Sequence, residues 1–177
     1  MKVKDLMTTN SLKYCSPETK LHNVAKLMEE GNCGALPVLD KNKKVVGIVT
    51  DRDIALALAK KHGETAPKIE VSEIMTKKVH SVHTDDEVTY ALKEMRLNKI
   101  GRLPVLDGEG KLKGVLSLHN LLSQTTTNPK LEIGQLKSSE ENILKTIIAL
   151  SDRYSTKEKT KAKKETPEKV LEEEEIW

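Results

Sequence analysis

The stretch GALPVLD at residues 34–40 returns later in the chain as GRLPVLD at residues 101–107. Further identities continue outward from these two stretches at the same offset, which grows by one residue near the start of each copy. The matched pairs are Met28 with Met95, Gly47 with Gly114, Val3 with Val71, Met7 with Met75 and Thr8 with Thr76. Self-similarity at a fixed period is the mark of a duplicated structural unit. The chain is therefore predicted to fold as two copies of one unit.

The hydrophobic pattern within each copy predicts a βαββα unit, and hence an α/β (α+β) protein. The first copy is expected to hold strands at 12–15, 35–39 and 45–50 and a final helix at 53–61. The second is expected to hold strands at 79–82, 102–106 and 111–117 and a final helix at 118–123. Because a unit of roughly 55 residues buries too little surface to be comfortable alone, the copies should pack about a pseudo-two-fold axis. Their interface should then create two related clefts.

Capping residues give the expected bounds of the first helix in each copy. Ser16 before Pro17 is typical of an N-cap followed by proline at the first helical position. Thr84 with Glu87 three residues later fits a capping box. The helices should stop near Gly31 and Asn98, residues suited to a left-handed position at a helix end.

The copies and their connections divide the chain into five parts. We expect the first repeat at 1–62, a polar linker at 63–70, the second repeat at 71–125, an extension with one amphipathic helix at 126–153, and a charged tail at 154–177. The tail carries a basic run and then an acidic run without apolar periodicity, so it is expected to be disordered.

Composition argues against several classes of function. Aromatic residues are 2% of the chain and Phe is absent, which disfavours stacking on single-stranded nucleic acid, and a net charge of +3 does not point to a nucleic-acid partner. No apolar run approaches the length of a membrane span, and Cys15 and Cys33 do not form a CxxC pair and are expected to be free thiols. We expect a cytoplasmic protein. The five histidines show no metal-ligand spacing, and no nucleophile, base or metal set points to an enzyme.

The residues best suited to chemistry are in GIVTDRD, at 47–53. Thr50 and Asp53 fit a capping box, and that structural interpretation stays open. The alternative is a nucleotide site. The helix N-terminus would offer unpaired N–H groups to an anion, Thr50 could bond a phosphate or ribose oxygen, Arg52 would add charge, and the Asp53 carboxylate would accept from two ribose hydroxyls. Gly47 would let the backbone approach a neighbouring group closely.

These motifs, over about residues 3–124, resemble the CBS (cystathionine-β-synthase) domain family. The resemblance rests on the MT start, on the GALPVLD and GRLPVLD strands, and on GIVTDRD with GVLSLHN. Tandem pairs of this family bind AMP, ADP, ATP or S-adenosylmethionine, with ribose and phosphate held by Thr/Ser-x-x-Asp and adenine by backbone of the partner copy. The resemblance implies a main cleft formed by Thr50, Arg52, Asp53, Thr76, Ile100, Gly101 and Arg102.

The second cleft implied by the resemblance departs from the family pattern. Ser117 is retained, but Asn120 stands where the ribose-binding Asp belongs, and an amide brings no charge. The residues expected there are Thr8, Cys33, Gly34, Ala35, Ser117, His119 and Asn120. We expect this cleft to be empty, weaker or differently selective.

The function expected from the sequence is that of a regulatory sensor without catalytic activity. An adenine nucleotide or S-adenosylmethionine would be its ligand, with no cofactor required. Its partners would be a second copy in a homodimer and an effector protein that the sequence does not identify. The alternative is a dimerisation or interaction scaffold that binds no nucleotide.

Overall fold

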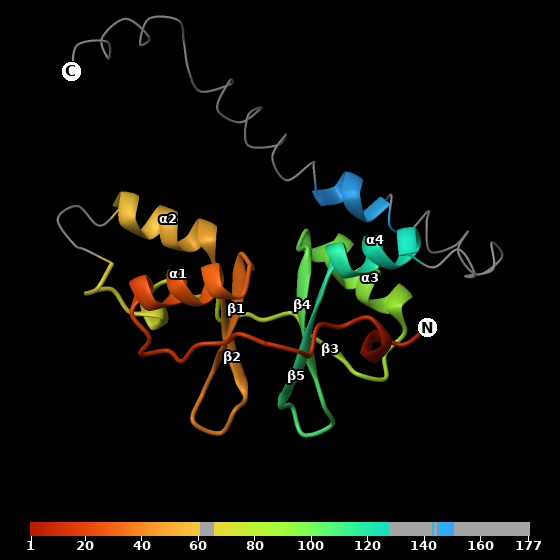
Figure 1. Ribbon diagram of the computed structural model, residues 1–177, viewed down its shortest axis with the longest axis horizontal. Coiled ribbons are helices and arrows are strands. Elements are labelled where there is room, and N and C mark those ends of the chain that lie inside the picture. The colour runs from red at the N-terminus through yellow and green to blue at the C-terminus, as the bar shows by residue number, and fades with distance from the viewer. Residues whose placement is uncertain (61–65, 128–142, 144, 151–177) are drawn as a thin grey trace, which may run out of the picture.

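The computed structural model describes residues 1–60, 66–127, 143 and 145–150 of the chain. It confirms the predicted α/β fold of two βαββα repeats, which lie side by side with their hairpins at the centre (Figure 1). The α-helices are α1 (Leu21–Glu30), α2 (Asp51–Lys60), α3 (Val88–Asn98) and α4 (Leu118–Thr127). The strands are β1 (Ala35–Leu39), β2 (Val45–Thr50), β3 (Val82–His83), β4 (Arg102–Leu106) and β5 (Leu112–Ser117). Two short 3-10 helices, η1 (Val3–Asp5) and η2 (Val71–Glu73), precede the repeats.

The hairpins β1–β2 and β4–β5 are antiparallel and share one register. Ala35 faces Thr50 in the first, and Arg102 faces Ser117 in the second. The strands predicted at 12–15 and 79–82 are shorter than expected: Cys15 makes a single parallel bridge to Val38, and β3 is two residues long.

Proline explains why these leading strands are short. In a parallel ladder the residue two before Cys15 would accept a hydrogen bond from the N–H at position 37, and Pro37 has none. Pro104 occupies the equivalent position beside β3. The prolines of the two LPVLD stretches therefore limit the sheets that these stretches build.

The helix starts predicted at Ser16–Pro17 and at Thr84 are wrong, because α1 begins at Leu21 and α3 at Val88. The first amide of each helix takes its partner from a segment outside the helix, and neither helix start has a side-chain cap hydrogen bond. The bonds run from the Leu21 N–H to the Ile69 carbonyl (3.1 Å) and from the Val88 N–H to the Met1 carbonyl (3.1 Å).

The helix ends are close to the prediction, but the left-handed residues come one position later. Gly31 has a right-handed conformation with φ −88°, and Asn32 follows with φ 43°. In the second repeat Asn98 is the last helical residue and Lys99 has φ 54°. The final helices α2 and α4 also extend beyond the predicted bounds, α2 at its start and α4 at its end.

The segment that precedes each repeat packs on the other repeat. Val3 and Leu6 belong to the hydrophobic core of the second repeat, whereas Ile69 and Val71 belong to the core of the first. We call residues 3–8 and 69–76 the exchanged segments. Each ends in a reciprocal pair of backbone hydrogen bonds to a hairpin strand. Thr8 pairs with Val115 (2.9 and 3.1 Å), and Thr76 pairs with Ile48 (2.9 and 3.1 Å).

Gly47 and Gly114 give the exchanged segments room to reach the hairpins. A Cβ on Gly47 would lie 2.6 Å from the sulfur of Met75, and one on Gly114 would lie 2.8 Å from both the sulfur of Met7 and the carbonyl oxygen of Thr8. The close approach expected at Gly47 is therefore to a methionine of the exchanged segment.

Gly114→Ala is expected to destabilise the protein by about 1–3 kcal/mol, because the Thr8 carbonyl is hydrogen-bonded backbone and cannot move aside. Gly47→Ala should cost less, since the flexible end of Met75 can shift. Gly108→Ala is the control, because nothing lies within 4 Å of its Cβ position. Urea titrations of the three variants measure the order, and a Gly114→Ala midpoint equal to that of Gly108→Ala would contradict it.

The described part of the predicted C-terminal helix is helical at residue 143 and at residues 145–150. Ile143 is buried in the core of the second repeat, and the buried Thr146 hydroxyl donates to the Leu92 carbonyl of α3 (3.4 Å). Residues 128–142, 144 and 151–153 of the predicted extension, and the tail predicted at 154–177, lie outside the described residues. No helix in the described part of the chain is long and apolar enough to cross a membrane.

Candidate functional site

A cavity of about 400 Å³ lies between the repeats, next to the start of α2. We call it the main cavity. The seven residues that the sequence assigned to the main cleft all line it: Thr50, Arg52, Asp53, Thr76, Ile100, Gly101 and Arg102. The sequence did not assign the remaining wall residues to this cleft; they are Ala35, Ile48, Lys78, Val79, His80 and Asn98. Lys78 and His80 could have been found from Thr76, because they follow it closely along the chain.

Thr50 and Asp53 form a capping box at the start of α2. One carboxylate oxygen of Asp53, Oδ2, accepts from the Thr50 N–H (2.9 Å) and hydroxyl (2.7 Å), and the Asp53 N–H donates to the Thr50 hydroxyl oxygen (3.2 Å). The interpretation of Thr50 and Asp53 as a capping box is therefore confirmed. The other oxygen, Oδ1, has no hydrogen bond with the described residues, so the carboxylate can cap the helix and still accept from a ligand.

The first three amides of α2 are already bonded, contrary to the expectation that they would be open to an anion. The Asp51 N–H donates to the Gly34 carbonyl (3.2 Å), the Arg52 N–H to the Asp51 carboxylate (2.7 Å), and the Asp53 N–H to Thr50. A phosphate in the main cavity would therefore find none of these three amides open to it.

The side chains of the main cavity carry an excess of positive charge. Arg52, Lys78 and Arg102 line it, and the Asp53 carboxylate is the one acidic side chain among its wall residues. None of the three basic side chains forms an ion pair or hydrogen bond with a residue that the structure describes. Cations grouped without partners in a concave site attract an anionic ligand, and guanidinium groups are well matched to phosphate.

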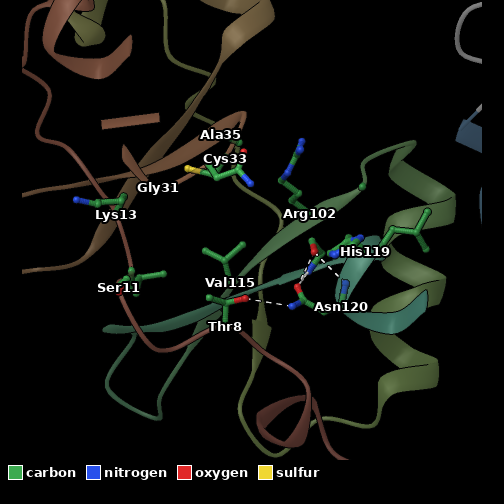
Figure 2. A pocket seen from close by; sticks show the side chains of 15 residues that line it. Thr8, Ser11, Lys13, Gly31, Cys33, Ala35, Arg102, Val115, His119 and Asn120 are labelled. Carbon is green, nitrogen blue, oxygen red and sulfur yellow. Dashed lines mark hydrogen bonds between the residues drawn. The ribbon is translucent and has the colours of Figure 1, made fainter. Parts of the chain in front are cut away.

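A second cavity, of about 600 Å³, lies beside the start of α4 (Figure 2). Six of the seven residues expected in the second cleft line it: Thr8, Cys33, Ala35, Ser117, His119 and Asn120. Gly34 does not line it. A Cβ on Gly34 would lie 2.6 Å from the Asp51 carboxylate and 3.6 Å from the Arg102 guanidinium, so this glycine makes room for those side chains.

Asn120 is more fully engaged than its counterpart Asp53. Its Oδ1 accepts from the Ser117 N–H (2.9 Å) and hydroxyl (2.5 Å), which repeats the capping geometry of the first repeat. Its Nδ2 donates to the Thr8 hydroxyl oxygen (3.1 Å), a bond visible in Figure 2. Both ends of the amide are therefore bonded, whereas Asp53 keeps one oxygen for a ligand.

Volume and chemistry favour different cavities as the principal ligand site. The second cavity is larger, but Asn120, its counterpart of Asp53, is an amide bonded on both sides. The main cavity is smaller and is lined by a carboxylate and three basic side chains, of which Arg102 also lines the second cavity. A volume of either size can hold a small molecule, so the two cavities differ as candidate sites in their polar groups rather than in their size.

The two cysteines differ in exposure. Cys15 is 5% exposed, and burial raises the pKa of its thiol to about 12. Cys33 is half-buried on the wall of the second cavity.

Iodoacetamide at pH 8 is expected to alkylate Cys33 at least tenfold faster than Cys15, because the thiolate is the nucleophile and Cys15 is both buried and protonated. Peptide mass spectrometry measures the two rates in one sample. Equal rates in the folded protein would contradict the burial of Cys15, and unfolding in urea should bring the rates together.

Among the described residues no cluster of His, Cys, Asp or Glu is suited to hold a metal ion. Each of the two cavities lies between a helix start of one repeat and a strand of the other. The sequence model of the CBS domain family matches residues 3–60 and 71–125 of the chain. The chain belongs to the CBS domain family. Its two repeats form a tandem CBS pair, as the sequence motifs indicated.

Curated relatives place the CBS pair in two kinds of protein. The CBS domain-containing protein YhcV of Bacillus subtilis is 32% identical over 143 residues, which are 80% of this chain and 97% of YhcV. Inosine-5'-monophosphate dehydrogenase of Methanocaldococcus jannaschii is 34% identical over 122 residues, which are 69% of this chain but 22% of the dehydrogenase. The pair is thus similar both to a stand-alone CBS protein and to a region of an enzyme.

Solved structures of other CBS pairs share the fold. The CBS domain pair of protein MJ0100, in complex with 5'-methylthioadenosine and S-adenosyl-L-methionine, is 28% identical with a TM-score of 0.64, and covers 71% of this chain and 96% of that one. CBSX2 in complex with AMP is 28% identical with a TM-score of 0.60, and covers 71% of this chain and 96% of that one.

Proposed function

We propose that this CBS pair is a regulatory module that binds an adenine nucleotide or another adenosyl ligand in the main cavity. The observation that carries the proposal is the wall of that cavity, where an open carboxylate oxygen of Asp53 lies among three basic side chains without partners. The adenosyl ligands of the MJ0100 pair and of CBSX2 support the choice of ligand class.

Each part of such a ligand has a counterpart on the cavity wall. The ribose hydroxyls would donate to Asp53 Oδ1, and the phosphate would meet Arg52, Lys78 and Arg102. The adenine would lie between the apolar side chains of Ile48 and Ile100, which line the cavity from the two repeats. Because these groups belong to both repeats, bound ligand would stabilise one relative arrangement of the repeats.

The output of the module would pass through another protein chain. Leu56 and Leu58 on α2 and Leu122 on α4 are exposed, and burying apolar surface favours association. We propose a homodimer through these outer helices, in which the arrangement of the repeats sets the surface offered to an effector protein. The exposed leucines also fit the alternative of a scaffold that binds no ligand.

Thermal melting with AMP, ADP, ATP, NAD and S-adenosylmethionine tests the proposal. A ligand at 100 times its Kd adds about 2.7 kcal/mol to stability, which for a chain of this size raises Tm by several degrees. Calorimetry then measures affinity and stoichiometry for each compound that raises Tm. If none of the five compounds raises Tm or gives a heat of binding, the proposal fails and the scaffold alternative stands.

A further inference from the structure

The two cavities share part of their wall. Ala35, Gly101 and Arg102 line both of them. Ala35 and Arg102 are equivalent positions, because they open β1 and β4 and face Thr50 and Ser117 in the two hairpins. One of these equivalent positions holds alanine and the other holds arginine. The wall that the two cavities share therefore carries one charged side chain.

The Arg102 guanidinium is available to either cavity. Within the described residues it makes no hydrogen bond or ion pair, and Arg102 is exposed at the start of β4. Figure 2 shows it between Ala35 and Cys33 of the first repeat and His119 and Asn120 of the second. Arginine side chains rearrange quickly when exposed, on a timescale of about picoseconds to nanoseconds.

The two cavities depend on Arg102 to different degrees. The main cavity also has Arg52 and Lys78 for an anion. The second cavity has Lys13, whose ammonium group is paired with the Glu30 carboxylate (2.9 Å), and His119. A phosphate in the second cavity would thus rely on the guanidinium that the main cavity also faces.

We propose that the two cavities compete for Arg102, so that two phosphate-bearing ligands weaken each other, whereas a phosphate-free adenosyl compound can occupy the second cavity beside a nucleotide. This inference rests on the proposed function, since both ligands are taken to be adenosyl compounds. Such a module responds to two ligands of different charge. A nucleotide bound in the main cavity disfavours a phosphate-bearing ligand in the second cavity but leaves that cavity open to a ligand without phosphate.

Alkylation of Cys33 reports occupancy of the second cavity, with Cys15 as the internal standard. We expect AMP to protect Cys33 at concentrations at least tenfold lower in Asp53→Ala, whose main cavity binds AMP poorly, than in the wild-type protein, where AMP fills the main cavity first. Protection by 5'-methylthioadenosine, which lacks phosphate, should need the same concentration in Asp53→Ala as in wild-type protein saturated with AMP.

Two further variants identify the residue responsible. With Arg102→Ala as the background, Asp53→Ala should no longer change the AMP concentration that protects Cys33. Lys78→Ala is the matched control, since it removes a cation from the main cavity alone. Lys78→Ala should weaken the binding of AMP in the main cavity. The two cavities should still compete for Arg102.

The possible failures are distinct. Equal AMP protection in wild type and Asp53→Ala, or no protection in Asp53→Ala, would overturn the competition for Arg102. The proposed function would stand in both cases if calorimetry still showed AMP binding that Asp53→Ala weakens. A wild-type protein that binds neither 5'-methylthioadenosine nor any of AMP, ADP, ATP, NAD and S-adenosylmethionine would overturn both proposals.

Discussion

Asp53→Ala is expected to weaken AMP binding by roughly 10- to 100-fold, because hydrogen bonds to a charged group contribute about 1.5–3 kcal/mol and each 1.4 kcal/mol is tenfold in Kd. The same change removes the capping box of α2, which costs about 1 kcal/mol of stability. Calorimetry gives the first quantity and urea unfolding the second. The loss in binding free energy should therefore exceed the loss in stability that the missing cap causes.

Asn120→Ala is the matched control for the capping effect. Asn120 makes the same bonds to Ser117 that Asp53 makes to Thr50, but it lines the second cavity. Its removal should destabilise the protein at least as much, since the bond from Asn120 to Thr8 is lost as well, and it should leave AMP binding in the main cavity unchanged. If Asp53→Ala lost stability like Asn120→Ala yet bound AMP with wild-type affinity, Asp53 would be a helix cap and nothing more.

Local sequence patterns were sufficient for the elements whose partners lie nearby. The hairpin strands 35–39 and 45–50 were predicted within their observed bounds, because two short apolar runs joined by a polar turn indicate an antiparallel pair. The Thr50–Asp53 pair was predicted for the same reason, since the cap is formed within four residues. What the pattern left open was whether a ligand also uses Asp53.

The features that the sequence did not reveal depend on the exchanged segments. The helix starts were misplaced because their first amides bond to Ile69 and Met1, which belong to segments distant in sequence. Thr76 was placed in the main cleft by family resemblance alone, and its reason is the pairing with Ile48, two residues before Thr50. The bond from Asn120 to Thr8 likewise exists because residues 3–8 reach the second repeat.

The exchange predicts that core substitutions act on the distant repeat. Leu6→Ala is expected to cost about 2–5 kcal/mol and to loosen the second repeat, although Leu6 directly precedes the strands and helices of the first repeat in sequence. Ile69→Ala should cost a similar amount and loosen the first repeat, although it immediately precedes the second. Each variant serves as the control for the other, because both remove a buried side chain from an exchanged segment.

Native-state hydrogen exchange locates the two effects, since local opening lowers the protection of the amides in the affected unit. Leu6→Ala should reduce protection in α3, β4 and β5, and Ile69→Ala should reduce it in α1, β1 and β2. The reverse pattern would mean that each segment packs on the repeat that it adjoins in sequence. Thr8 and Thr76 would then lie away from the cavities to which the exchange brings them, so the composition of both ligand sites depends on this result.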